Sequence, residues 1–281
     1  MKMSDYKMYA FADEACGQVD GQIKAMLRNG LQGLEIRGVD GQNIADISME
    51  KAREVRKKLD DNGLVVWSMG SPIGKIDIVN GDFTAHLEKL RHTLELAHVL
   101  GAENMRMFSF YIPGNDHALW RQKVIDQVGE MLRTAEGSGV FMCHENEKGI
   151  YGDLAPRCRE LLDLFPQLHN VFDPANYVQS GQDTLAGWQL LKGRTRYLHI
   201  KDALEDGRVV PAGKGIGHVA EIVKDFLANG GRHMSVEPHL SVFAGLKDLE
   251  RAGEETKMAY TYASSDEAFD AACNALKECL L

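Results

Sequence analysis

The sequence predicts a (β/α)₈ barrel, in which eight parallel strands alternate with helices. Its length of 281 residues is close to the roughly 250 residues that such a barrel needs as one domain. Amphipathic helical stripes alternate with short apolar runs throughout the chain. Glycine separates a helix from the next run at Gly30, Gly63, Gly101 and Gly139. Glycine is favoured there because the residue after a helix often adopts the left-handed conformation.

The alternation can be followed from one end of the chain to the other, and it implies a parallel sheet with right-handed crossovers. The expected strands are residues 9–14, 31–37, 64–70, 105–110, 140–146, 169–176, 196–203 and 233–240. The expected helices contain residues 19–27, 52–59, 87–97, 124–132, 158–165, 185–191, 219–227 and 265–280.

The chain reads as one domain over residues 1–281, since no Pro- or Ser-rich linker interrupts it. Residues 240–263 form an insertion between the eighth strand and the last helix. This segment is polar with interspersed aromatic residues, so it either covers the barrel mouth or makes a subunit contact.

Composition narrows the class of partner. The net charge of −9 argues against nucleic acid, which needs a basic face. Five cysteines, an odd number without zinc-finger spacing, indicate reduced thiols in the cytoplasm. The N-terminus has no apolar leader and no run approaches 18 apolar residues, so we expect no membrane association. A small-molecule partner is the expectation that remains.

Four successive predicted strands end in a side chain that can bind metal. These residues are Glu145, Asp173, His199 and Glu237, each directly after apolar strand residues. In such barrels the active site lies at the C-terminal ends of the strands. A single strand-end carboxylate or imidazole is often only a hydrogen-bonded structural group, but four in succession favour a common site.

Three carboxylates and one imidazole suit a hard or borderline divalent cation. Mn²⁺ is the first choice, and Mg²⁺ or Co²⁺ are alternatives. Zn²⁺ is less favoured because the set offers no cysteine, although carboxylate-rich zinc sites exist.

Five motifs resemble a known family over nearly the whole chain. They are CHENEKGIYGD (143–153), FDPAN (172–176), LHIKDA (198–203), PAGKG (211–215) and SVEPH (235–239). They look like the sugar phosphate isomerase/epimerase superfamily, the xylose isomerase-like TIM barrels that include AP endonuclease family 2. The resemblance implies that Glu145, Asp173, His199 and Glu237 are metal ligands. It also implies that Glu145 and Glu237 act as acid and base.

The resemblance implies an enzyme, a metal-dependent isomerase or epimerase of a sugar or sugar derivative. It would remove a proton next to a carbonyl, and the metal would stabilise the resulting enediolate. Homodimers and homotetramers are common in the family. One position departs from the ketose 3-epimerases, which have a histidine where this chain has Asn176.

Other function classes stay open at this point. An inosose-dehydratase-like lyase would begin with the same proton removal on a keto-sugar or inosose. An AP endonuclease would need further metal-binding histidines, and the ends of strands two to four offer none. A non-catalytic binding protein would be expected to lack part of the ligand set.

Several residues near the strand ends are candidates for contacting substrate. His144 should point away from Glu145, unless a bend at the strand end brings it into the mouth. Lys201 either neutralises an anionic substrate group or pairs with a neighbouring aspartate. The full set of candidates is His144, Asn176, Lys201, Arg208, His218, Glu35 and Trp67, with His239 as a weaker one.

Glu35 and a glycine-rich stretch each have a simpler structural interpretation beside the functional one. Glu35 either lines the pocket or pairs with Arg37. The glycine-rich stretch from Gly213 to Gly217 either binds a phosphate or carboxylate through its amides and Lys214, or is a tight turn. It lacks the spacing of a P-loop.

Overall fold

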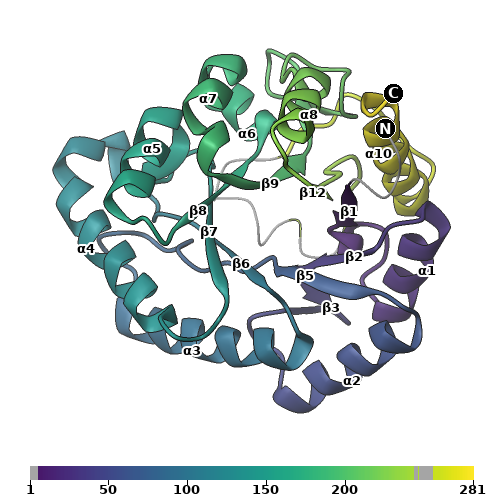
Figure 1. Cartoon of the computed structure of the whole chain (residues 1–281), viewed down its shortest axis with the longest axis horizontal. Helices are drawn as coiled ribbons and strands as arrows, with labels where there is room; N and C mark the ends of the chain where they lie inside the picture. The colour runs from purple at the N-terminus through teal and green to yellow at the C-terminus, as the bar shows by residue number, and fades with distance from the viewer. Residues whose placement is uncertain (1–5, 244–245, 247–255) are drawn as a thin grey trace.

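The barrel is closed by eight parallel strands in the order β1-β12-β9-β8-β7-β6-β5-β2 (Figure 1). The structure is a computed structural model that describes residues 6–243, 246 and 256–281. The barrel strands are β1 (Lys7–Ala10), β2 (Gly33–Ile36), β5 (Val65–Met69), β6 (Asn104–Met107), β7 (Phe141–Glu145), β8 (His169–Phe172), β9 (Thr195–Ile200) and β12 (His233–Val236). The predicted fold class is therefore confirmed.

Helices connect successive strands and surround the barrel, as Figure 1 shows. Their apolar stripes pack on the outer face of the sheet and form one continuous core with it. The helices are α1 (Val19–Asn29), α2 (Met49–Asp61), α3 (Phe83–Leu100), α4 (His117–Ala135), α5 (Ala155–Leu164), α6 (Pro174–Gln179), α7 (Thr184–Leu191), α8 (Val219–Ala228) and α10 (Ser265–Cys279).

Local sequence signals explain where several helices begin and end. Gly30 and Gly101 follow α1 and α3 in the left-handed conformation, with φ of 67° and 70°, as the glycine spacing predicts. The hydroxyl of Ser264 caps α10 by accepting a hydrogen bond from the backbone N–H of Glu267 at 3.1 Å. Both devices give partners to backbone groups that a helix end leaves free.

The first strand is shorter than predicted, because β1 ends at Ala10 and residues Ala12–Glu14 form a 3₁₀ helix. This turn directs the carboxylates of Asp13 and Glu14 toward the guanidinium of Arg37, at 2.9 Å each. Helix α6 is also absent from the prediction. Its six residues are too few to show a helical period.

The glycine-rich loop after β9 is organised by one buried carboxylate. Asp202 accepts hydrogen bonds from the backbone amides of Gly213, Gly215 and Gly217 at 2.9, 3.0 and 2.9 Å. A Cβ on Gly215 would lie 2.4 Å from an Asp202 oxygen, so the close approach requires glycine. These amides are already bonded, which corrects the anion-binding interpretation of the loop in favour of the tight turn.

Replacing Asp202 should therefore unfold this loop before the rest of the barrel. Asp202→Ala removes the acceptor of three backbone amides, of which that of Gly217 is buried, and a buried unsatisfied group costs about 1–3 kcal/mol. We expect a loss of about 1–3 kcal/mol in the free energy of unfolding, measured by urea denaturation. Asp202→Asn keeps one oxygen acceptor and should retain part of that stability. Equal stability of Asp202→Ala and the wild type would contradict this role.

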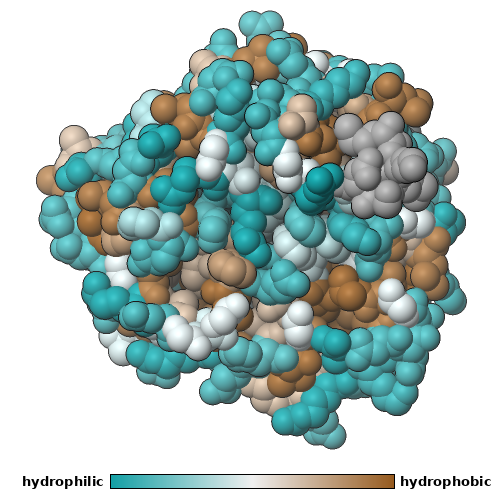
Figure 2. All heavy atoms as spheres, in the orientation of Figure 1, coloured by the Kyte–Doolittle hydropathy of each residue, from teal (hydrophilic) through white to brown (hydrophobic). Residues whose placement is uncertain are grey.

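The outer surface on the face shown in Figure 2 is mostly hydrophilic, with hydrophobic side chains in separate groups. Across the ranges that the structure describes, no helix combines the length and apolar character needed to cross a membrane. All five cysteines are free thiols in the structure. Much of the predicted insertion at 240–263 lies outside the described residues.

Candidate metal centre

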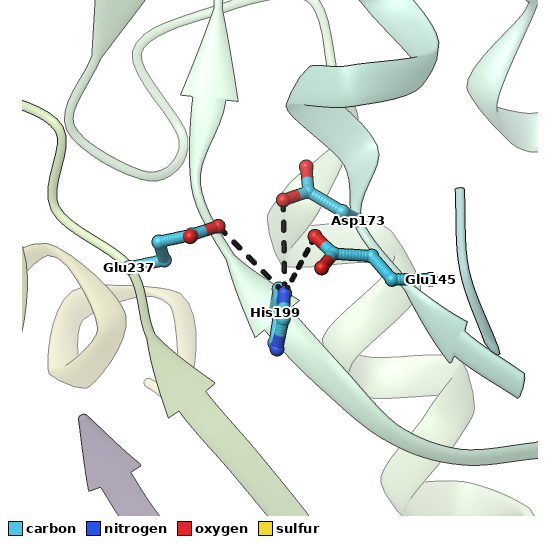
Figure 3. A group of neighbouring side chains, drawn as sticks. All are labelled: Glu145, Asp173, His199 and Glu237. Atoms are coloured by element: carbon cyan, nitrogen blue, oxygen red, sulfur yellow. Dashed lines mark hydrogen bonds and ion pairs between the residues drawn. The ribbon is translucent and has the colours of Figure 1, made fainter. Parts of the chain in front are cut away.

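Four side chains from consecutive strands of the barrel converge at one point (Figure 3). The Nδ1 atom of His199 lies 2.9 Å from Glu145 Oε1, 3.7 Å from Glu237 Oε2 and 3.9 Å from Asp173 Oδ2. Each residue offers one ligand atom, and these atoms lie within 4.8 Å of one another. All four side chains are buried. The four residues that the sequence placed at the ends of successive strands therefore lie together in space.

The backbone at each strand end explains this convergence. Glu145 is the last residue of β7, and His199 lies in β9 opposite Ser235 of β12. Asp173 follows β8 as the N-cap of α6, where its Oδ1 accepts from the amide of Asn176 at 2.9 Å. The second oxygen of Asp173 is thereby left to face the centre.

The donor set fits a divalent cation. Glu145 Oε2 and Asp173 Oδ2 are buried side-chain oxygens that accept no hydrogen bond. Each of the two oxygens lies beside a cation, Arg106 or Lys201, but a buried oxygen that accepts no hydrogen bond is uncommon and calls for a ligand or a function. Three carboxylates and an imidazole whose ligand atoms lie within 4.8 Å of one another are donors that suit Mn²⁺, Mg²⁺, Co²⁺ or Zn²⁺.

Three buried cationic side chains surround the carboxylates. The ammonium of Lys201 lies 2.8 Å from Glu237 Oε2 and 3.0 Å from Asp173 Oδ2. The guanidinium of Arg106 lies 3.2 Å from Glu145 Oε2 and 3.6 Å from Glu237 Oε1. Arg37 reaches Glu237 Oε1 at 3.3 Å. These contacts offset part of the negative charge that burial would otherwise make costly.

The protonation of the site follows from burial and these contacts. Burial, with Glu237 and Glu145 nearby, raises the pKa of Asp173 to about 7, although Lys201 opposes the rise. Burial also acts to raise the pKa of Glu145, but His199 and Arg106 lower it below the ordinary value. Against the same effect of burial, Lys201 and the nearby histidines hold the pKa of Glu237 well below its usual range. Both glutamates are therefore ionised at neutral pH.

A second group of possible ligands, Glu14, Glu237 and His239, adjoins the first. Arg37 already fills the cation position there, because it bonds Glu14 at 2.9 Å and Glu237 at 3.3 Å. His239 adopts a φ of 46° that brings its backbone N–H to Glu14 at 2.6 Å. Its ring nitrogen Nδ1 lies 3.9 Å from Glu237 Oε1.

Three of the candidate substrate residues lie beside the four ligands, namely Asn176, Lys201 and His239. The amide nitrogen of Asn176 donates to Glu145 Oε1 at 3.2 Å and to the carbonyl of Asn146 at 2.9 Å. Lys201 pairs with Asp173, which is the second of the two alternatives that the sequence left open, and it also pairs with Glu237. A contact of these residues with substrate stays a prediction.

Two other candidates face elsewhere. His144 points behind β7, as strand alternation predicts, and its Nε2 lies 2.9 Å from Ser109 Oγ. Burial lowers the pKa of its imidazole to about 4. Glu35 neither lines the mouth nor pairs with Arg37, since it lies beneath the ligands and contacts His199 Nε2 at 3.0 Å.

The remaining three candidates are not brought to the four ligands. Trp67 is the third of the five residues of β5 and stacks on His233, the first residue of β12, at a centroid distance of 3.8 Å. It therefore lies toward the end of the barrel opposite the four residues. Arg208 is exposed on the β10–β11 hairpin (Asp202–Ala203 and Val209–Val210) and pairs with Asp206 at 2.8 Å. The imidazole of His218 lies 3.0 Å from the hydroxyl of Thr184 in α7.

Arg106 is a site residue that the sequence interpretation missed. It occupies the second-last position of β6 between Met105 and Met107, and its side chain points into the barrel between the rings of Phe11 and Phe108, 5.0 Å from each centroid. The signal in the sequence was a charged residue between two apolar residues of a predicted strand. A buried arginine is rare unless it pairs with an opposite charge, so Arg106 could have been placed near the carboxylates.

Comparison with known protein families agrees with the fold. The model of the xylose isomerase-like TIM barrel family matches residues 23–260. The chain belongs to this family. The matched range contains all four strands that precede or carry these residues, β7, β8, β9 and β12. No curated protein sequence matches the chain significantly.

Solved structures share the fold of this family member at low sequence identity. The probable 3-DHS dehydratase of petrobactin synthesis from Bacillus anthracis is 17% identical, with a TM-score of 0.73 and coverage of 96% and 98% of the two chains. The IOLI protein with a bound zinc atom is 14% identical, with a TM-score of 0.72 and 98% coverage of both. A D-psicose 3-epimerase solved with D-fructose is 15% identical, with a TM-score of 0.73 and 97% coverage of both.

Proposed function

We propose that this xylose isomerase-like barrel is a divalent-metal-dependent isomerase or epimerase of a small sugar or sugar derivative. The observation that carries the proposal is the placement of two ionised carboxylates around one buried ligand centre. In Figure 3, Glu145 and Glu237 approach His199 from opposite sides. Their nearest oxygens lie 2.9 and 3.7 Å from its Nδ1 atom.

Glu145, Asp173, His199 and Glu237 would hold the metal, and Mn²⁺ is the ion that we propose first. A divalent cation at this position supplies a Lewis acid that polarises a carbonyl and stabilises the charge left by proton removal. The structural neighbour with a bound zinc atom supports a metal in this fold, without deciding which ion this chain binds.

The two glutamates would move the proton. An ionised carboxylate beside the substrate accepts the proton from the carbon next to the carbonyl. Return of that proton by the same carboxylate to the former carbonyl carbon, with the hydroxyl proton of the carbon that lost it passing to the former carbonyl oxygen, gives aldose–ketose isomerisation. Delivery from the opposite carboxylate, which must then enter the reaction protonated, gives epimerisation. Burial of the site excludes water that would compete for the proton.

Hydrogen–deuterium exchange tests this function. The purified, Mn²⁺-loaded protein is incubated in D₂O with a panel of ketoses, aldoses and inososes, and products are examined by NMR. We expect deuterium at the carbon next to the carbonyl of one sugar. Loss of water from a substrate would instead assign a lyase, the reaction class named for the neighbour from Bacillus anthracis. Absence of exchange and of product with every member of the panel would contradict both.

A further inference from the structure

A buried hydrogen-bonded group lies beneath the four ligands on the barrel axis. The carboxylate of Glu35, in β2, is fully buried. Its Oε1 accepts from the hydroxyl of Tyr197 at 2.7 Å and of Ser68 at 3.2 Å, and its Oε2 lies 3.0 Å from His199 Nε2. The two hydroxyls are also 3.1 Å apart. Glu35 is thus fixed on one side by strands β5 and β9 and touches a ligand on the other.

This contact decides which ring nitrogen of His199 faces the centre. Both ring nitrogens lie beside a carboxylate, Nε2 at 3.0 Å from Glu35 Oε2 and Nδ1 at 2.9 Å from Glu145 Oε1. Nδ1 is the atom that lies among Glu145, Asp173 and Glu237, so a metal at the centre would take the place of its hydrogen and leave Nε2–H bonded to Glu35. The edges of neighbouring aromatic rings, Phe11 at 5.2 Å and Tyr197 at 5.5 Å, limit rotation of the imidazole.

We propose that Glu35 is a positioning residue that holds His199 with Nε2–H bound to its carboxylate and Nδ1 free to bind the metal. This inference rests on the proposed metal site and adds to it a residue that touches neither metal nor substrate. The tautomer and the ring orientation of a histidine ligand are commonly set by a carboxylate on its second nitrogen, and loss of that partner weakens metal binding about 10- to 100-fold.

The side-chain chemistry of position 35 predicts a graded series of variants. Glu35→Leu removes the acceptor, while Tyr197 and Ser68 retain each other as partners. Glu35→Gln keeps an oxygen that can accept from His199 Nε2, so it is the matched control. Mn²⁺ binding to metal-stripped protein is measured by calorimetry, with thermal unfolding recorded for each variant. We expect affinity to fall about 10- to 100-fold in Glu35→Leu and only a few-fold in Glu35→Gln.

A merely structural role would lower the stability of Glu35→Leu and leave its Mn²⁺ affinity unchanged, and that result would overturn the proposal. If the wild type itself bound no Mn²⁺, the metal site would fail together with the inference. If wild type binds and the Glu35→Leu affinity is equal, the role of Glu35 alone fails. The two failures are therefore distinguishable.

A measurement on the wild type makes the test independent of how the variants fold. The ¹⁵N-labelled protein is loaded with diamagnetic Zn²⁺, and long-range ¹H–¹⁵N spectra report which nitrogen of His199 carries hydrogen. We expect a protonated Nε2 that exchanges slowly with solvent, because Glu35 and the ring are fully buried. A hydrogen on Nδ1, with Nε2 bound to the metal, would overturn the assignment.

Discussion

Glu145→Gln and Glu237→Gln should each reduce proton exchange by about 10²- to 10⁴-fold, the usual contribution of a positioned acid or base. The amide keeps the size of the side chain and an oxygen for the metal, but it cannot accept the proton. Both carboxylates are ionised in the structure, since their pKa values lie below the ordinary range. Exchange is measured in D₂O on the sugar that the wild type converts.

The matched control for these variants is Glu147→Gln. Glu147 is two residues from Glu145 and also pairs with a cation, Lys75 at 2.7 Å, but it is not among the four ligands. We expect it to keep most of the exchange activity. Full exchange by Glu145→Gln and Glu237→Gln with metal bound would contradict their catalytic assignment.

Lys201→Met should have the largest effect on stability. Its ammonium lies between Asp173 and Glu237, and removing one partner of a buried ion pair typically costs about 3–5 kcal/mol. The metal-free variant should therefore unfold at lower urea concentration. Because Asp173 then lacks a cation and Glu237 keeps only its arginine contacts, Mn²⁺ should stabilise Lys201→Met more than it stabilises the wild type.

An exposed ion pair provides the comparison for that experiment. Lys192 pairs with Asp225 at 3.3 Å, and both side chains are one-third exposed. Lys192→Met should change the free energy of unfolding by about 0–1 kcal/mol, since exposed pairs contribute little. Metal-free Lys201→Met as stable as the wild type, or a smaller response to Mn²⁺, would refute the role assigned to Lys201.

The fold was predictable because its signals are local and repeat. Helical stripes ending at Gly30 and Gly101 recur with the period of a βα unit, and the glycines adopt the expected left-handed conformation. One error arose because α6 is too short to show a helical hydrophobic period. Another arose at Ala12–Glu14, where the chain forms a 3₁₀ turn within the segment predicted as the first strand.

The clustering of Glu145, Asp173, His199 and Glu237 was predictable for a related reason, while the positions of several candidate substrate residues were not. Strand alternation tells which face a side chain occupies, but not its depth along the barrel axis. Glu35 and Trp67 both lie on barrel strands, yet the first lies beneath the ligands and the second at the far end. Arg208 and His218 lie in loops between strands and helices. These segments have no hydrophobic periodicity, so the sequence does not predict which way their side chains point.

The most direct test of the four-ligand centre is a calorimetric titration of metal-stripped protein with Mn²⁺, comparing the wild type with Asp173→Asn. Asparagine keeps the cap on the amide of Asn176 but removes the charge that faces the centre. Asp183→Asn, at the N-cap of α7, is the control. We predict one Mn²⁺ per wild-type chain, unchanged binding in Asp183→Asn and strongly weakened binding in Asp173→Asn. No binding by the wild type, or equal binding by all three proteins, would contradict the proposed metal centre.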